Sequence, residues 1–211
     1  LVPVIYNGEG AFGSRWETNV VMRNLSNFPV ISIPDVARPM PEVPGGAPRP
    51  ISAAFGNRPA GVVLFVPRGS DVAFTSHIRD VSRDAAQWGT EMPVVRERDT
   101  REKIIFSNVP SDPRYRLQLR IYGIDGVSVP LAVSAGPNAV HYLQLGGPCT
   151  ETPCNSNEPA YASLDLGQRF PPFGLPNTII VEQQLDQPRR LWAFITVTNN
   201  DTQHVTVISP Q

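Results

Sequence analysis

Two cysteines are the residues of this chain whose type and spacing most directly suggest chemistry. Cys149 and Cys154 lie five positions apart in a loop that has a proline beside each of them. A disulfide that closes so short a ring contributes about 2 kcal/mol in the chain-entropy account. A metal site or two free thiols are the alternatives, but no further cysteine or nearby histidine completes a tetrahedral ligand set. We therefore predict a disulfide between Cys149 and Cys154, which indicates an oxidising, extracellular destination.

The three histidines show neither metal-binding nor catalytic spacing. His77, His141 and His204 fall in three separate predicted strand contexts, and none belongs to a His-x-His or His-Glu-x-x-His pattern. A serine nucleophile on an elbow would need Gly-x-Ser-x-Gly, which the sequence lacks. His77, Asp80 and Ser82 are close in sequence, but a triad requires convergence in space. We predict no metal, no cofactor and no catalytic residue.

Acidic residues do not form an obvious catalytic pair either. The segment 91–101 interleaves glutamates and aspartate with arginines. Such a pattern is typical of surface ion pairs, each of which contributes little to stability, rather than of the two facing carboxylates of a glycosidase. We therefore expect a non-enzymatic protein.

Carbohydrate binding is the small-ligand hypothesis that the sequence leaves open. β-Sandwich modules stack sugars on exposed aromatic rings. The candidate rings are those of Trp16, Trp88, Trp192, Tyr6, Tyr115, Tyr122, Tyr142 and Tyr161. Most of them alternate with polar neighbours, which core or half-buried positions also explain, and Trp88, beside Gly89, is the candidate for exposure.

Two short patterns match N-glycosylation acceptors. Asn24-Leu-Ser26 and Asn200-Asp-Thr202 both fall at predicted turns, where a glycan fits without disturbing a strand. Asn24 and Asn200 are therefore candidate glycosylation sites.

Composition limits the class of partner. The net charge of −1 and the pI near 6.3 predict no binding to nucleic acid or to an anionic membrane surface. No apolar run approaches the roughly 20 residues that span a bilayer, so we expect no membrane insertion. The chain begins with leucine, which suggests a processed secretory protein whose signal peptide has been removed.

The elements that must position these residues are strands. With 23 prolines and 16 glycines the chain is unsuited to helices, whereas its 41% hydrophobic content is too high for disorder. The segments 191–209 and 16–33 each read as two β-rich runs around an asparagine-containing turn, which predicts two similar hairpins. Strands at roughly 8–12-residue spacing favour an all-β fold of two immunoglobulin-like β-sandwich domains in tandem.

We place the seam between the two domains at Val109-Pro-Ser-Asp-Pro113, where two prolines bracket a turn. The first domain, 1–110, includes a leading extended segment (1–13) and a proline-rich loop (34–50). The second, 111–211, includes the disulfide loop (149–154).

The leading segment is the candidate carrier of function. Val2, Val4, Ile5 and Tyr6 are apolar and strand-like, precede a glycine-rich stretch, and belong to no obvious local hairpin. Such a segment either pairs within its own domain or completes the sheet of a second molecule as a donated strand. The second alternative predicts self-assembly.

Several runs resemble secreted β-sandwich proteins of unknown function from environmental bacteria. The similar runs are Trp88-Gly-Thr-Glu-Met-Pro-Val-Val-Arg-Glu97, the run from Pro110 to Tyr122, the run from Trp192 to Thr206, and the opening Gly13-Ser14…Trp16…Thr18…Asn24. The resemblance spans most of the chain and implies a secreted β protein without an assigned activity. The expected function is a secreted structural protein that self-assembles into a filament or surface layer; the alternative is a carbohydrate-binding or adhesive module.

Overall fold

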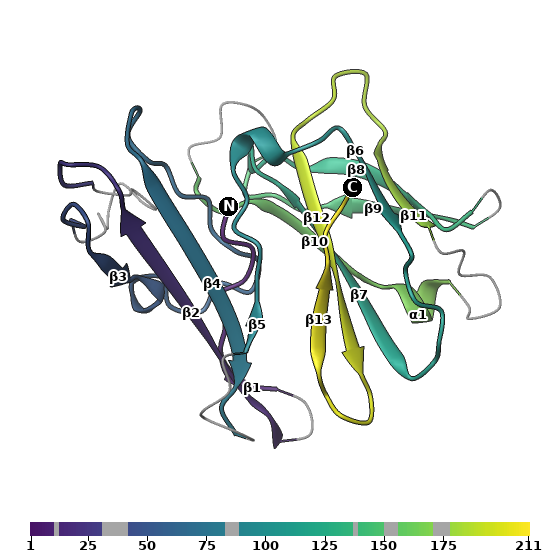
Figure 1. Ribbon diagram of the computed structural model, residues 1–211. Coiled ribbons are helices and arrows are strands. Elements are labelled where there is room, and N and C mark those ends of the chain that lie inside the picture. The colour runs from purple at the N-terminus through teal and green to yellow at the C-terminus, as the bar shows by residue number, and fades with distance from the viewer. Residues whose placement is uncertain (11–12, 31–41, 83–88, 137–138, 150–155, 171–177) are drawn as a thin grey trace. The chain divides into compact units, whose positions relative to one another are not determined.

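The chain folds into two compact units built almost entirely of antiparallel β-sheet (Figure 1). The computed structural model describes residues 1–10, 13–30, 42–82, 89–136, 139–149, 156–170 and 178–211. Unit 1 comprises Leu1–Val95 and unit 2 comprises Arg96–Gln211. The all-β prediction is confirmed.

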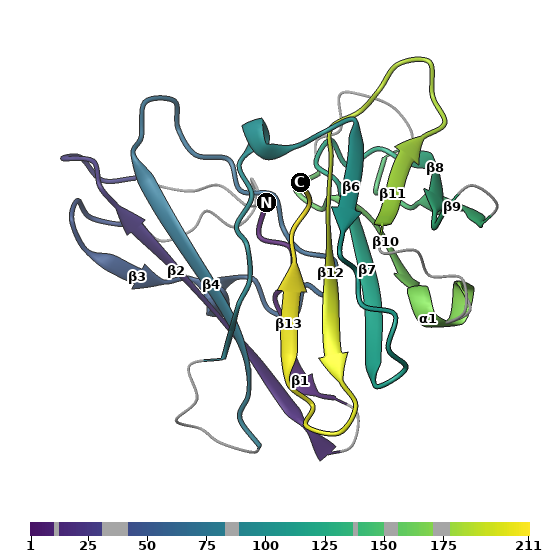
Figure 2. The same cartoon turned by 45° about the vertical axis from the view of Figure 1, so that its right-hand side comes forward.

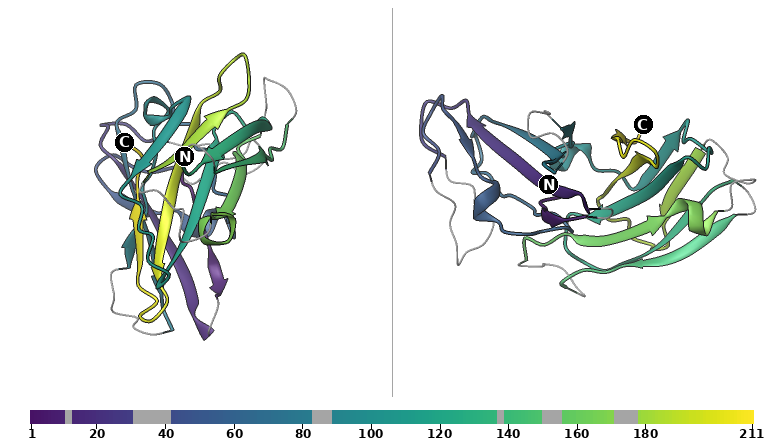
Figure 3. Two further views of the ribbon diagram at one scale, coloured as in Figure 1. Left: turned by 90° about the vertical axis from the view of Figure 1, so that its right-hand side faces the viewer. Right: turned by 90° about the horizontal axis from the view of Figure 1, so that it is seen from below.

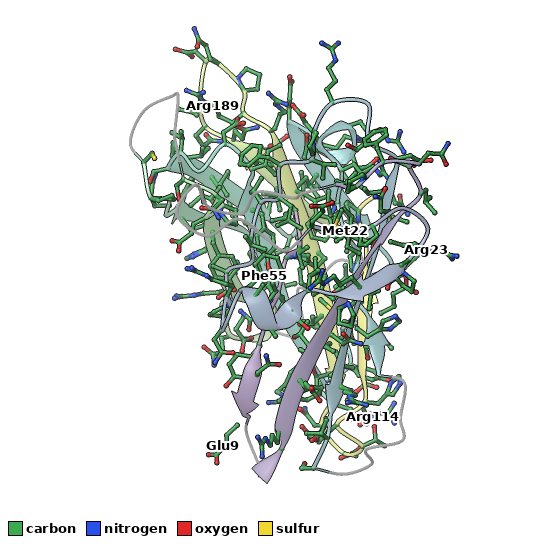
Figure 4. The ribbon with its side chains drawn as sticks, turned by 90° about the vertical axis from the view of Figure 1, so that its left-hand side faces the viewer. Glu9, Met22, Arg23, Phe55, Arg114 and Arg189 are labelled. Atoms are coloured by element: carbon green, nitrogen blue, oxygen red, sulfur yellow. The ribbon has the colours of Figure 1, made fainter. Side chains whose placement is uncertain are left out.

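Unit 1 is organised around one long strand. Its strands are β1 (Asn7–Glu9), β2 (Arg15–Asn24), β3 (Pro48–Pro50), β4 (Val72–Asp80) and β5 (Thr90–Glu91). The sheet order is β1-β2-β4-β5. The short strand β3 pairs with the same side of β2 as β1 does, but farther along β2. Side chains of β2 alternate in burial, so that Met22 is buried and Arg23 projects outward (Figure 4).

The segment that precedes β1 packs into the core of its own unit. Val2 exchanges backbone hydrogen bonds with Val62 (2.9 and 2.8 Å), and Ile5 does the same with Arg58 (3.0 and 2.7 Å). On its other side, the Leu1 carbonyl accepts a hydrogen bond from the Val95 amide at 2.9 Å. Val2 and Ile5 are fully buried. Of the two alternatives for this segment, pairing within its own unit is the one observed.

The proline-rich loop is only partly a loop. Its residues 34–41 lie outside the described residues, but Val43 is buried and pairs with Val30, and Pro48–Pro50 forms β3. Proline is tolerated there because β3 is an edge strand whose outer side needs no hydrogen-bond donor.

Unit 2 is a β-sandwich of two four-stranded sheets (Figures 2 and 3). Its strands are β6 (Lys103–Ser107), β7 (Tyr115–Gly123), β8 (Val129–Ser134), β9 (Val140–Leu145), β10 (Ala160–Asp165), β11 (Thr178–Gln183), β12 (Leu191–Asn199) and β13 (Val205–Ile208). One short helix, α1 (Leu166–Arg169), follows β10 and is capped by the Asp165 carboxylate, which accepts a hydrogen bond from the Gln168 amide.

The strand order of unit 2 differs from the immunoglobulin order. The sheets run β10-β7-β12-β13 and β6-β11-β8-β9, so consecutive strands change sheet except within β8–β9 and β12–β13. An immunoglobulin-like sandwich instead keeps its first two strands side by side in one sheet. Alternation between the sheets is the arrangement of a jelly roll.

Period-two burial defines the core of this sandwich. Leu117, Leu119 and Ile121 of β7 face inward while Arg116 and the partly exposed Arg120 alternate with them. β7 and β12 are the central strands of their sheet and pair along their whole length. This pairing places Val197 and Ile195 of β12 on the same inner face.

Two predictions differ from the structure, one about the partners of β2 and one about the boundary between the two units. The hairpin 191–209 is confirmed as β12–β13. The described partners of β2 are β4, β1 and β3, and Val30 of the predicted return strand pairs with Val43, while residues 31–33 of that strand lie outside the described residues. The boundary between the units also lies earlier than the predicted seam at 109–113, because β6 pairs with β11 and so belongs to unit 2.

Candidate functional site

A groove of about 680 Å³ opens at one end of the unit 2 sandwich. Polar side chains that line it come from five places: the segment after β6, the start of β7, the end of β12, the β12–β13 turn and β13. These residues are Asn108, Tyr115, Asn199, Thr202, His204 and Thr206. Pro110, Val197 and Ile208 supply its apolar surface.

Strand register brings these side chains together. Asn199 lies opposite Tyr115 in the β12–β7 pair, and Val197 lies opposite Thr206 in the β12–β13 pair. Directly opposed residues share a face of the sheet, and this face is the inner one. The groove is therefore the open end of the sandwich interior, where Tyr115 and Ile208 are only partly buried against the core.

The β12–β13 turn is held in place by asparagine side chains. Asn199 Oδ1 accepts hydrogen bonds from the amides of Asp201 (2.8 Å) and Thr202 (3.0 Å). The Asn200 backbone amide also donates to the Arg114 carbonyl at 2.8 Å, which connects the turn to the segment before β7. Gln203 adopts a positive φ of 59°, which closes the turn. These hydrogen bonds hold the β12–β13 turn and the segment before β7 in place against each other.

An ion pair braces the segment before β7. Arg114 Nη2 donates to Asp112 Oδ2 at 2.6 Å, and the Arg114 backbone amide donates to Asp112 Oδ1 at 2.9 Å (Arg114 is labelled in Figure 4). These hydrogen bonds from Arg114 hold the pKa of the Asp112 carboxyl below its usual value. Both side chains face solvent, so the pair positions the segment more than it stabilises the unit.

Several polar groups in the groove have no protein partner. Among the described residues, no hydrogen bond engages the side chains of Asn108, His204 or Thr206, the Tyr115 hydroxyl, or Asn199 Nδ2. No carboxylate, guanidinium or ammonium group is among the described residues that line it. The groove thus offers uncharged donors and acceptors above an apolar floor.

A second hollow, of about 530 Å³, is lined by Arg96, Glu97, Arg98 and Arg190. Its charges are already matched, because Arg190 pairs with Glu97 and Arg98 lies 3.9 Å from Asp99. The interleaved charges of 91–101 therefore include the predicted kind of surface ion pair.

The predicted cysteine pair falls partly outside the described residues. Cys154 is among residues 150–155, which the structure leaves out, so the disulfide stays a prediction. Cys149 is described, and its amide donates to the Gly126 carbonyl at 3.2 Å.

The three histidines lie on separate elements. His77 lies on β4 of unit 1, His141 on β9, and His204 beside the groove. Within the described ranges, no three His, Cys, Asp or Glu residues gather where they could hold a metal ion. Asp80 serves a turn: its Oδ1 accepts from the Ser82 hydroxyl at 2.5 Å and the Arg15 amide at 3.1 Å.

The predicted aromatic candidates fall into three groups: buried rings that pack together, one exposed ring, and rings that have local roles or lie outside the described residues. Tyr122 stacks on Phe194 with ring centroids 6.0 Å apart and also contacts Trp192 and Tyr161. Burial raises the pKa of the Tyr122 hydroxyl above its usual value. Tyr142 is instead 69% exposed, on β9.

The remaining rings have local roles or are not described. Trp16 donates from Nε1 to the Ser14 hydroxyl at 3.0 Å, and Tyr6 donates to the Glu9 carbonyl at 2.6 Å. Trp88, the residue that the sequence marked as a sugar-stacking candidate, lies outside the described residues. Among the predicted candidates that the structure describes, Tyr115 is the ring that lines the groove.

The two candidate glycosylation sites differ. Asn24 is fully buried, and its Nδ2 donates to the carbonyls of Phe28 (2.7 Å) and Val43 (2.8 Å). Both protons of the nitrogen that would carry a glycan are therefore committed to the fold. Asn200 is exposed, and its Nδ2 makes only a 3.3 Å hydrogen bond to the Pro113 carbonyl.

The sequence missed most of the groove. Asn108, Asn199 and Thr206 carry no motif, and Thr202 belongs only to the glycosylation pattern that ends the Asn200-Asp-Thr202 run. Their proximity depends on strand register across separate chain segments. Asn108 also adopts a positive φ of 58°, a conformation that sequence alone does not reveal.

Comparison with known proteins identifies no relative: the chain matches no protein-family model, no curated protein and no solved structure. None of the helices in the described part of the chain is long and apolar enough to cross a membrane.

Proposed function

We propose that the chain is a secreted, non-enzymatic structural protein whose copies associate through the outer edge of β9. The observation that carries the proposal is the state of this edge: six residues without a carboxylate, lysine or arginine, paired on one side only within the described part of the chain, with Val140 45% and Tyr142 69% exposed. An exposed apolar strand edge is a template for pairing with another chain.

The other edge strands of the described chain are shorter than β9 or partly paired on their outer side. β3 contains Pro48 and Pro50, and β5 has only two residues. The β6 carbonyl of Ile105 accepts a hydrogen bond from the Gln211 amide at 3.1 Å. Tyr161 on β10 exchanges hydrogen bonds with Gly146 (2.6 and 3.2 Å). β13 is short and lines the groove. By comparison, β9 is the longest open edge.

Association through β9 does not require the leading segment, which the sequence predicted as a possible donated strand. Val2 and Ile5 already complete their own unit, so assembly through them requires that unit 1 open first. The edge of β9 needs no such rearrangement.

Antiparallel pairing of two β9 strands suits a two-fold arrangement. If Tyr142 lies opposite its own copy, Val140 lies opposite Gln144, and each opposed pair shares a face of the joined sheet. No like charges meet, because Val140–Leu145 contains no charged residue. A tyrosine pair at the centre adds a cross-strand aromatic contact. Growth beyond a pair requires a second contact, for which the β13 edge is the candidate.

Light scattering after size exclusion, over a concentration series, tests the proposal with Tyr142→Lys. We expect the wild type to show a concentration-dependent mass above 23.1 kDa and Tyr142→Lys to remain monomeric, because a lysine opposite its copy repels it. Phe65→Lys is the control, since Phe65 is 58% exposed but lies in unit 1. A wild type that is monomeric throughout, or equal loss in both variants, contradicts the proposal.

A further inference from the structure

We infer that the groove at the open end of unit 2 is a binding site for a neutral saccharide. The inference is independent of assembly through β9, because Tyr142 does not line the groove.

The size of the groove suits a small ligand. Its volume of about 680 Å³ falls within the roughly 300–1,000 Å³ of ligand sites. Its floor is apolar, since Val197 belongs to the buried core and Tyr115 and Ile208 pack against that core. A flat ring with one apolar face can lie on this floor, and the Tyr115 side chain offers a stacking surface.

The polar groups specify hydroxyls rather than charges. Asn199 Nδ2 offers two donors, and the Asn108 side-chain amide and the Thr206 hydroxyl offer both donors and acceptors, none of them engaged by another described residue. Lysine and arginine are the usual partners of a phosphate or carboxylate ligand, and neither is among the described lining residues, whose nitrogen-bearing side chains are Asn108, Asn199 and His204. A ligand with several hydroxyls and no charge satisfies both conditions.

The site is organised before a ligand arrives. Asn199 Oδ1 is occupied by two turn amides, which fixes the side chain and directs Nδ2 away from the turn. The turn is further tied down by Asn200 to the Arg114 carbonyl and by Arg116 Nη2 to Gln203 Oε1 at 2.9 Å. A fixed turn lowers the ordering cost of binding.

Saturation-transfer NMR and calorimetry on the full chain test the inference. The probes are neutral di- and trisaccharides of glucose, mannose, galactose and N-acetylglucosamine. We expect at least one probe to bind, and Tyr115→Ala to weaken it by about tenfold or more through loss of the stacking surface. Thr206→Arg, at an exposed position, fills the groove without touching the core and should also abolish binding.

Tyr142→Ala is the matched control, because it removes an exposed tyrosine outside the groove. Binding that survives Tyr115→Ala and Thr206→Arg, or that is lost in Tyr142→Ala, places the site elsewhere and overturns the inference. Failure of every saccharide to bind overturns it as well, while the β9 experiment is read independently by mass. Binding of a neutral peptide in place of a saccharide would refute the assigned ligand class.

Discussion

Two strands that begin alike, β2 and β12, end in opposite surroundings. Each has tryptophan as its second residue and asparagine as its last, and each terminal asparagine accepts a hydrogen bond from the amide two residues on (Ser26, 2.9 Å; Asp201, 2.8 Å). Asn24 Nδ2 donates to the carbonyls of Phe28 and Val43, whereas Asn199 lines the groove and its Nδ2 has no hydrogen-bond partner among the described residues. The same local turn chemistry becomes a fold element in unit 1 and an available donor in unit 2.

Tertiary pairing explains the difference. β12 turns back directly into β13, so Asn199 lies next to the turn, at the open end of the sandwich. β2 is flanked by β4 along its whole length, and the chain after Asn24 leads to Val30, which pairs with Val43. The asparagine that ends β2 is consequently enclosed.

The largest expected effect is at Asn24. Asn24→Ala removes the donors for the Phe28 and Val43 carbonyls, the latter in a fully buried bond, and should lower the free energy of unfolding by about 3 kcal/mol. Urea unfolding measures it. A loss similar to that of Asn199→Ala would remove the distinction between the two asparagines.

Asn199→Ala should cost about 1 kcal/mol, because its two turn hydrogen bonds are exposed to water, which can replace them. The same urea titration applies. Asn200→Ala serves as the control, since it removes only one long side-chain hydrogen bond. A cost at Asn199 above that at Asn24 would reverse the comparison.

Expression in a eukaryotic secretion host that glycosylates asparagines tests the comparison between the ends of β2 and β12 without any substitution. We expect peptide mapping by mass spectrometry of the folded product to show a glycan on Asn200 and none on Asn24, because a glycan on Asn24 is incompatible with its buried hydrogen bonds. Folded molecules that carry a glycan on Asn24 would contradict the packing described for β2.

The smallest effect is a pH dependence confined to the β12 end. The pKa of Asp112 is lowered in the folded state by Arg114, so the contribution of this pair is present above the unfolded value near 3.9 and is lost as pH falls toward the lower folded pKa. Wild type and Asp112→Asn should therefore converge in unfolding midpoint as pH falls from 7 to 3. A constant difference across that range would show that the pair does not act through the carboxylate charge.

The sequence predicted those parts of the fold whose signal lies within one short segment, and it did not predict pairings between distant segments. Period-two alternation predicted β7, and the β12–β13 hairpin followed from its polar turn, because both signals lie within one short segment. The partners of β2 did not follow, since β4 begins 48 residues after β2 ends (72 − 24) and similar β-rich runs lie between them. The buried pairing of Val2 with Val62 and the jelly-roll order are likewise long-range choices.

The strand order of unit 2 also sets when this unit can form. Apart from β8–β9 and β12–β13, every strand pair in its sheets joins segments distant in the chain, such as β6 with β11 and β7 with β12. Loop-closure entropy makes such topologies slow to fold. A nascent chain must wait for residues 178–199 before either sheet has its central pair. Until then it carries β9 as an unshielded segment, and transiently exposed strand edges of this kind make folding intermediates prone to association.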